Sequence, residues 1–215
     1  MNAGRAGGVV DLSDRTQLVL TGPDRVRYLN GQVTSDVRKL QPGQTQAACV
    51  TTAKGKLCAD IFITAQEEAL FVDAEGSLRE ALLARLERYI VADDVAIEDV
   101  TETHALLHYF GSEAAPTTGV GKIASARRLG QPGWDLRLTC EELAAGREPL
   151  MGDRVRVDAA LAETLRIEAG IPRWGHELDE NTLPARGRAR QTHIDYHKGC
   201  YIGQEVISAC GVWGM

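Results

Sequence analysis

The chain has few cysteines, and their spacing is not that of a metal site. There are five of them, an odd number spread over the sequence, and no two form Cys-x-x-Cys. This argues against a disulfide framework, a zinc site or a dedicated iron–sulfur ligand set, so no bound metal is expected. The cysteines are Cys49, Cys58, Cys140, Cys200 and Cys210.

Long apolar runs and an excess of positive charge are also absent. No stretch approaches the roughly 18 apolar residues that a membrane span needs, and residues 1–8 lack the apolar run of a secretory signal. The formal net charge of −6 argues against direct binding of nucleic acid. We therefore expect a cytoplasmic protein, or one of the mitochondrial matrix in a eukaryote, with neither nucleic acid nor membrane as partner.

Several catalytic signatures are missing as well. The sequence contains no Gly-x-Ser-x-Gly, no Gly-x-x-x-x-Gly-Lys-Ser/Thr and no His-Glu-x-x-His, which are the marks of common hydrolases, nucleotide-binding loops and zinc proteases. What is present is an ordinary globular composition, 44% hydrophobic and 25% charged. A length of 215 residues suffices for one large domain or two small ones.

Strand and helix patterns alternate along the chain and predict an α+β fold with a mixed sheet. Strands are predicted over 17–21, 46–52, 55–64, 70–72, 95–100, 105–110 and 134–138. Helices are predicted after Gly22-Pro23, over 77–90 with Ser77 and Glu80 as a capping box, from Thr139 to about Gly146 with Glu142 completing a second box, and over 159–169 behind Asp158.

The segment Lys198-Gly199-Cys200-Tyr201-Ile202-Gly203-Gln204-Glu205 carries the most chemical information. It places a thiol beside a cation and between two glycines. A nearby cation favours the thiolate, and glycines let the backbone approach a partner closely. The segment therefore indicates a reactive or ligand-facing cysteine, and the alternative is a free cysteine that packs as a small hydrophobe.

Two further groups have both a functional and a structural interpretation. Glu168 ends a predicted helix, where the helix dipole disfavours an acid. A ligand that donates hydrogen bonds, such as an aminopyrimidine, would compensate, and so would a salt bridge to Arg166 or Arg173. The arginines at 186, 188 and 190 form either an anion-binding face or a solvated edge.

Three separated segments together resemble one family, the YgfZ / glycine-cleavage T-protein superfamily. Residues 22–37, from Gly22-Pro23-Asp24 to Ser35-Asp36-Val37, resemble its opening motif. Residues 53–60, Ala-Lys-Gly-Lys-Leu-Cys-Ala-Asp, resemble its next motif. Residues 166–175 followed by 198–205 resemble the third, and Lys-Gly-Cys-Tyr-x-Gly-Gln-Glu is the signature of the YgfZ branch.

The resemblance implies a folate-binding aminomethyltransferase-type fold, with two mixed α/β subdomains around a central pocket and a C-terminal β-barrel. It implies tetrahydrofolate or a derivative as cofactor, iron–sulfur client or assembly proteins as partners, and a role in assembly or repair of 4Fe–4S proteins, including tRNA-modifying enzymes. The rival function is folate-dependent aminomethyl or methyl transfer. By resemblance, folate is held by Glu168, Asp73, Tyr201 and Arg173, while Cys200 with Lys198 supplies thiol chemistry within the motif of Gly199, Gly203, Gln204 and Glu205.

The chain also departs from the family pattern. Val72-Asp73-Ala74 has Asp where T-proteins have Asn, which favours the non-catalytic branch. The family continues past residue 208 into the barrel, whereas residues 209–215 are atypical, and we expect this tail to be out of frame. The expected organisation is a loose lead-in over 1–8, a first subdomain over 9–110, a second over 111–208 and the tail over 209–215.

Overall fold

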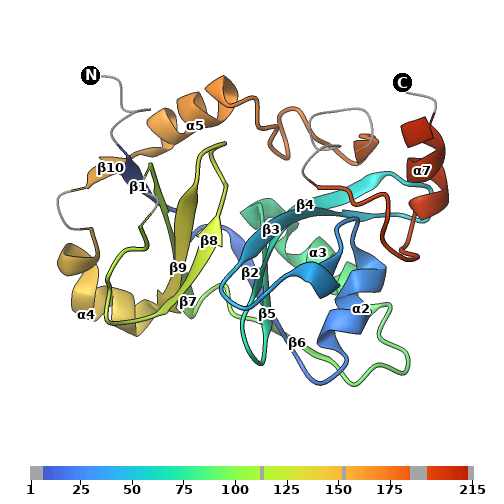
Figure 1. The fold of residues 1–215 in the computed structure, drawn as a ribbon, viewed down its shortest axis with the longest axis horizontal. Helices are drawn as coiled ribbons and strands as arrows, with labels where there is room; N and C mark the ends of the chain where they lie inside the picture. The colour runs from blue at the N-terminus through green and yellow to red at the C-terminus, as the bar shows by residue number, and fades with distance from the viewer. Residues whose placement is uncertain (1–6, 112–113, 152–153, 185–192, 213–215) are drawn as a thin grey trace.

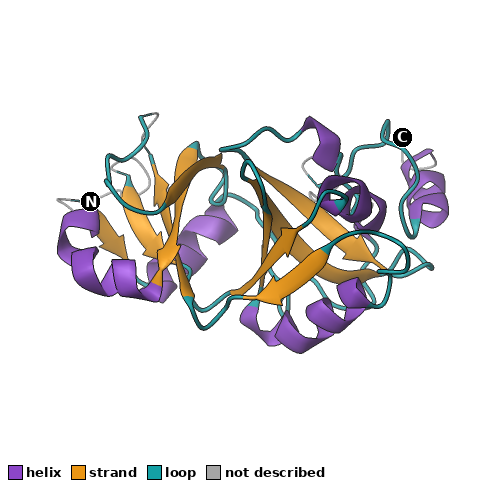
Figure 2. Cartoon of the chain, turned by 90° about the horizontal axis from the view of Figure 1, so that it is seen from below, coloured by secondary structure: helices purple, strands orange, loops and turns teal. Residues whose placement is uncertain are grey.

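The computed structural model describes residues 7–111, 114–151, 154–184 and 193–212. They form two five-stranded sheets with helices packed on them, which confirms the α+β expectation. Figures 1 and 2 show the sheets side by side, each with its own helices.

The first sheet has the strand order β3-β4-β5-β2-β6, and every neighbouring pair is antiparallel. Two helices and two 3₁₀ turns belong to the same half of the molecule. Its elements are β2 (Thr16–Thr21), α2 (Arg25–Gln32), η1 (Val37–Lys39), β3 (Thr45–Thr51), β4 (Leu57–Ala65), β5 (Leu70–Ala74), η2 (Gly76–Leu78), α3 (Arg79–Glu87) and β6 (Ala96–Asp99).

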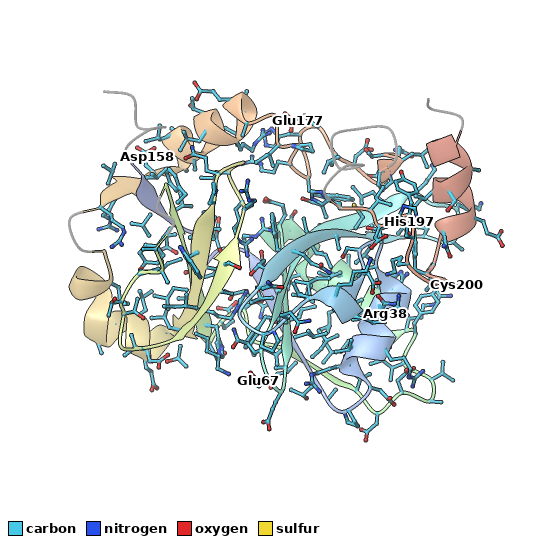
Figure 3. The ribbon with its side chains drawn as sticks, viewed as in Figure 1. Arg38, Glu67, Asp158, Glu177, His197 and Cys200 are labelled. Carbon is cyan, nitrogen blue, oxygen red and sulfur yellow. The ribbon has the colours of Figure 1, made fainter. Side chains whose placement is uncertain are left out.

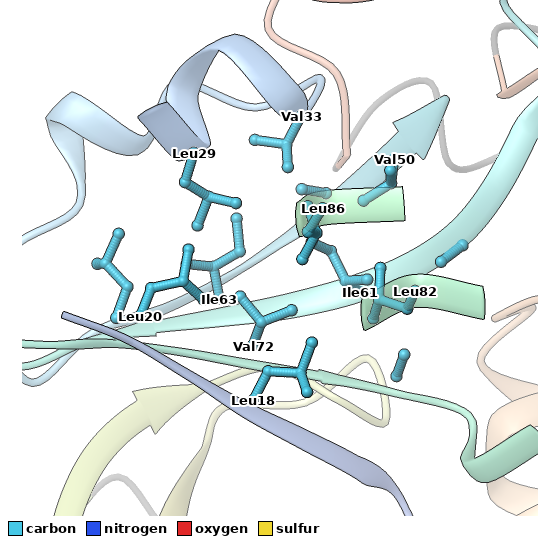
Figure 4. Close-up of a cluster of buried hydrophobic side chains, with 14 of the residues drawn as sticks. Leu18, Leu20, Leu29, Val33, Val50, Ile61, Ile63, Val72, Leu82 and Leu86 are labelled. Carbon is cyan, nitrogen blue, oxygen red and sulfur yellow. The ribbon is translucent and has the colours of Figure 1, made fainter. Parts of the chain in front are cut away.

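The core of this half lies between the sheet and the helices α2 and α3. Leu29 of α2 and Leu82 and Leu86 of α3 meet Ile61 and Ile63 of β4, and all five side chains are buried (Figure 4). Strand β4 alternates apolar side chains over most of its length, which is why the pattern predicts it from the sequence.

The second sheet has the order β10-β1-β7-β9-β8. Only the β1–β10 pair is parallel among these described strands. Helix α4 packs on one face through Leu150, and α5 on the other through Leu165. Its elements are β1 (Gly8–Asp11), β7 (His104–Phe110), β8 (Lys122–Ala126), β9 (Gly133–Thr139), α4 (Cys140–Met151), β10 (Val155–Val157) and α5 (Ala159–Glu168); α7 (Gln204–Val212) lies apart, beside the first sheet (Figure 1).

The two sheets meet at their edges. Strand β3 is the edge of one sheet and β8 the edge of the other. The N–H of Ser125 in β8 donates to the carbonyl of Gly43 just before β3, at 2.8 Å. The sheets do not divide the chain at residue 110, because β1 and β7 pair with strands of the second half. The expected division into 9–110 and 111–208 therefore does not coincide with the sheets, and as a domain boundary it stays a prediction.

Two of the three predicted helix caps form. Asp158 accepts from the N–H of Leu161, and Thr139 and Glu142 exchange backbone-to-side-chain hydrogen bonds at 2.8 and 3.1 Å. The box predicted at Ser77 and Glu80 is wrong. A 3₁₀ turn occupies Gly76–Leu78, so the helix begins two residues later than predicted, at Arg79, and no side chain caps it.

Candidate functional site

A large cavity of ≈ 1110 Å³ opens where the two sheets meet; we call it the larger cavity. Its walls come from β3 and β4 on one side, from β8 and the loop before β9 on the other, and from residues 169–172 after α5. Among the described lining residues three are cationic and none is acidic, although the chain as a whole is acidic. The cations are Lys39, Arg127 and Arg128.

Aromatic faces and one neutral histidine complete the larger cavity. Phe62 and Trp134 lie on its wall. His193 also lines it, and burial lowers the pKa of His193 to about 4, so its ring is uncharged at neutral pH. Arg127 is exposed and enters none of the ion pairs or hydrogen bonds given for the described residues. Such a lining suits a flat aromatic molecule that carries negative charge.

Arg128 ties the two sheets together beneath this cavity. Its Nε donates to Asp135 of β9 at 2.8 and 2.9 Å, and its Nη1 and Nη2 donate to Asp73 of β5 at 2.9 and 2.6 Å. The guanidinium also lies 4.2 Å from the ring centroid of Phe62. Burial opposes its charge, but the two carboxylates outweigh burial and raise the pKa of Arg128 above its ordinary value.

Asp73 is completely buried in this network. Besides Arg128, Arg15 donates to its carboxylate at 2.6 Å, and Arg137 lies 3.5 Å away. Burial alone would raise the pKa of Asp73, yet the surrounding arginines lower it below its usual range. The carboxylate is thus occupied by arginines, and Asp73 does not line the larger cavity. Its expected contact with folate stays a prediction.

Asp60 is an acid that the sequence interpretation did not nominate, although it ends the second resemblance motif. It lines a smaller cavity of ≈ 250 Å³, which shares Phe62 and Arg128 with the larger one. Burial raises the pKa of Asp60 to about 6. One signal could have identified it, since Asp60 is the sole charged residue in strand β4. Arg128, by contrast, leaves no local signal, because its partner Asp73 is 55 positions away and lies in the other sheet from Asp135.

The signature segment 198–205 is anchored by Lys198. The buried Lys198 Nζ donates to the carbonyl oxygens of Asn30, Val33 and Ser35 at 2.6, 2.7 and 2.7 Å. Burial lowers the pKa of Lys198 to about 8, and the three carbonyls use all three N–H donors of the ammonium. The geometry makes Lys198 an anchor for the loop, and a catalytic part for it stays a prediction.

Segments from all three resemblance motifs meet at this anchor. The carbonyl of Ile202 accepts from the hydroxyl of Thr51 at 2.6 Å, next to residues 53–60. Gly203 has φ +87°, and a Cβ there would lie 2.5 Å from the carbonyl oxygen of Thr52. Gly55 likewise leaves room for Val206 of α7, at 2.9 Å from an added Cβ. The glycines therefore permit close backbone packing between distant motifs.

Cys200 lies in this anchored loop with its side chain exposed. Figure 3 shows it on the same side of the molecule as Arg38 and His197, away from Asp158. Tyr201 points inward instead and packs with Ile194 and Ile207. Burial raises the pKa of Tyr201 to about 12. The motif residues Gly199 and Glu205 are exposed, and Gln204 is half-buried at the start of α7.

The other expected folate ligands are scattered. Glu168 is exposed at the end of α5, directly before residues 169–172 of the larger cavity. Its alternative salt bridge does not form among the described residues, because Arg166 pairs with Glu163 and Glu177, and Arg173 with Glu163. Arg173 lines the smaller cavity, and Tyr201 lines neither. These folate roles stay predictions.

Some expectations concern residues outside the described part of the chain, or features that were expected to be absent. The arginines at 186, 188 and 190 lie outside the described residues. Within the described ranges there is no group of three or more His, Cys, Asp or Glu that could hold a metal ion. Nor does any described helix have the length and apolarity to span a membrane.

Comparison with known proteins agrees with the fold. The crystal structure of glycine cleavage system aminomethyltransferase T from Bartonella henselae matches with a TM-score of 0.81 and 20% identity, over 95% of this chain and 63% of that one. Among curated relatives, an aminomethyltransferase of Rubrobacter xylanophilus is 28% identical over 93% of this chain and 60% of its own.

Two further relatives carry other names. A tRNA-modifying protein YgfZ of Yersinia pestis is 28% identical over 93% of this chain and 66% of its own. A mitochondrial iron–sulfur cluster assembly factor IBA57 homolog of Phaeosphaeria nodorum is 26% identical over 94% of this chain and 51% of its own. The chain thus spans between about half and two thirds of these relatives.

A match to a family model shows which family the chain belongs to. The model of the GCVT N-terminal domain matches residues 2–118, which is more than half of the chain. The chain belongs to the GCVT N-terminal domain family, within the YgfZ/GcvT-like superfamily.

Proposed function

We propose that this chain binds tetrahydrofolate or a derivative in the larger cavity and supports the assembly or repair of 4Fe–4S proteins, among them tRNA-modifying enzymes. The observation that carries the proposal is the lining of that cavity: two aromatic rings, no acidic residue among those described, and Arg127 as a cation without an ion pair among them, beside the ion-paired Lys39 and Arg128. The names of the YgfZ and IBA57 relatives support the iron–sulfur role.

The residues present suit a folate. A tetrahydrofolate is a pterin joined through an aromatic ring to a glutamate that carries two carboxylates. The rings of Phe62 and Trp134 offer apolar faces for the aromatic part. The guanidinium of Arg127, which has no ion pair among the described residues, suits a carboxylate, which it can bind in a bidentate manner. A volume of ≈ 1110 Å³ is ample for a molecule of this size.

In this proposal, Cys200 is the residue that contacts the partner protein. The buried Lys198 holds the loop in place, and the thiol of Cys200 is exposed at its surface. An anchored, exposed thiol can contact a cluster or thiol of another protein. Asp73, held by arginines, leaves the Val72-Asp73-Ala74 segment without a free carboxylate toward the larger cavity, which supports the non-transferase branch.

The thiol role is tested with matched cysteine variants. Cys140 is a second exposed free cysteine, in α4. Activity of a 4Fe–4S tRNA-modifying enzyme is measured in cells that lack their own YgfZ-type factor and express either variant. We expect Cys200→Ser to lower that activity while retaining tetrahydrofolate binding, and Cys140→Ser to change neither. Full activity with Cys200→Ser contradicts the role given to the thiol.

Asp60 favours a second candidate, folate-dependent aminomethyl or methyl transfer. An acid whose pKa is raised to about 6 can exchange a proton near neutral pH, and Asp60 lines the smaller cavity, two residues before Phe62, which lines both. The two functions are separated by a methylene-transfer assay with tetrahydrofolate. Transfer that is unaffected by Cys200→Ala supports the enzyme, whereas absence of any transfer supports the iron–sulfur factor.

A further inference from the structure

The smaller cavity is a chamber beside α5 that adjoins the larger cavity. Its ≈ 250 Å³ are enclosed by residues of β1, β4, β10 and α5 and of the loop that follows α5. Figure 1 shows α5 lying across the second sheet, next to that loop. The cavity touches the larger one only at Phe62, Arg128, Ile171 and Pro172 among the described lining residues.

Buried polar atoms without a partner surround this chamber. Four lining residues each present one such atom, and none of the four meets a hydrogen-bond partner within the part of the chain that is described. Buried polar groups in folded proteins are nearly always paired, so atoms like these indicate something that fills the space between them. The atoms are Arg15 Nη2, Asp60 Oδ1, His108 Nε2 and Arg173 Nε.

His108 presents an acceptor to the chamber. Its side chain is 1% exposed, and its Nδ1 lies 2.9 Å from Oδ1 of Asp135. A carboxylate only accepts hydrogen bonds, so it holds a proton on Nδ1, and in the neutral imidazole Nε2 is then the acceptor. The ring packs closely on Gly133, where a Cβ would lie 2.8 Å from its Cε1.

Among the acids that line the chamber, Asp60 alone has a buried oxygen without a partner in the described part of the chain; Asp11, Asp14 and Asp158 are exposed. Each lining arginine is already paired with carboxylates, whereas Asp60 has no ion pair among the described residues. The pairs are Arg15 with Asp73 and Glu75, Arg128 with Asp73 and Asp135, Arg166 with Glu163 and Glu177, and Arg173 with Glu163. The chamber therefore has excess negative charge, two buried acceptors without a described partner, Asp60 Oδ1 and His108 Nε2, and two buried arginine donors without one, Arg15 Nη2 and Arg173 Nε.

We propose that the smaller cavity is a binding site for a small organic ammonium ion, whose N–H groups donate to Asp60 and His108. A protonated amine supplies a counter-charge for Asp60 and donors for both acceptors on one compact group, while the N–H groups of Arg15 and Arg173 are left to water in the same chamber. The volume admits an amine of a few heavy atoms, since a water molecule takes roughly 30 Å³ in the liquid. The site does not depend on folate binding in the larger cavity.

The test uses methylammonium as probe and tetramethylammonium as its matched control, because the latter has the same charge and no N–H. Both are added as chlorides at equal ionic strength to the full chain, and binding is followed by ligand-observed NMR and by thermal unfolding. We expect saturable binding and stabilisation with methylammonium alone. Equal effects of the two ions overturn the proposal and leave a chamber filled by water.

Three substitutions test whether methylammonium binds in this chamber. Asp60→Asn keeps the shape and removes the charge, and we expect at least a tenfold loss of methylammonium affinity. Asp14→Asn, which alters another acid of the same lining, should cost less than threefold. His108→Asn retains a donor for Asp135 but loses the Nε2 acceptor, so affinity should fall several-fold while the unliganded protein stays folded. Unchanged affinity in Asp60→Asn, or tighter binding of Mg²⁺ than of methylammonium, refutes the assignment.

Discussion

Substitution of Asp73 by Asn tests whether the buried charge network holds the two sheets together. The variant keeps the shape of the side chain and removes its charge. Arg15 and Arg128 then lose the carboxylate to which they donate at 2.6–2.9 Å, and Arg137 at 3.5 Å loses its counter-charge. Breaking a buried ion pair by removing one partner costs about 3–5 kcal/mol. Because a domain is stable by only about 5–15 kcal/mol in total, the loss should be large.

The assay is equilibrium unfolding in urea at pH 7. The folded-state pKa of Asp73 is lowered, so its contribution is complete above the unfolded value of about 4 and is lost as the pH falls through the folded value. The difference between wild type and variant should therefore shrink in acid. Asp99→Asn is the control, because Asp99 forms a partly exposed pair with Arg79 and should cost less than about 1 kcal/mol. A loss below about 1 kcal/mol in Asp73→Asn refutes the reasoning.

Three further predictions concern single residues. Asp60→Asn should stabilise the protein at pH 8 and not at pH 4. The pKa of Asp60 rises from 3.8 to about 6 on folding, so the ionised acid costs stability, by at most roughly 3 kcal/mol, at pH values above the pKa of the unfolded state. Unfolding free energies at the two pH values check this, and equal effects contradict it. Gly203→Ala should destabilise by about 1–3 kcal/mol, since φ is +87° and the added Cβ meets the carbonyl of Thr52, whereas Gly199→Ala has open space and should be near neutral in the same urea experiment. Lys198→Met leaves three carbonyls without their donor and should cost about 2–4 kcal/mol in the same urea experiment, while Lys56→Met at an exposed site should be near neutral.

Much of the fold follows from local patterns. Strand β4 is long and alternating, and Asp158 stands at the start of an apolar stripe, so both are predicted correctly. Strands β1, β8 and β10 are missed because they are short or rich in small and polar residues. They are strands because of their neighbours in the sheet, and β1 pairs with residues about a hundred and more positions away.

The candidate site, like the fold, is predicted from the sequence only in part. The composition of segment 198–205 identifies it as unusual, but nothing local shows that Lys198 reaches the carbonyls of Asn30 and Ser35. The lining of the larger cavity depends on Arg128, whose partners Asp73 and Asp135 sit in different sheets. Such contacts are set by tertiary packing, which a pattern along one segment does not contain.

The measurement that tests the central claim most directly is an anaerobic calorimetric titration of the chain with tetrahydrofolate. It compares wild type with Arg127→Gln, whose guanidinium lies in the larger cavity, and with Arg156→Gln, an exposed arginine outside it. We predict one saturable site, at least a tenfold weaker affinity in Arg127→Gln, equivalent to about 1.4 kcal/mol, and no change in Arg156→Gln. Absence of saturable binding, or equal affinity in all three proteins, contradicts the assignment of folate to this cavity.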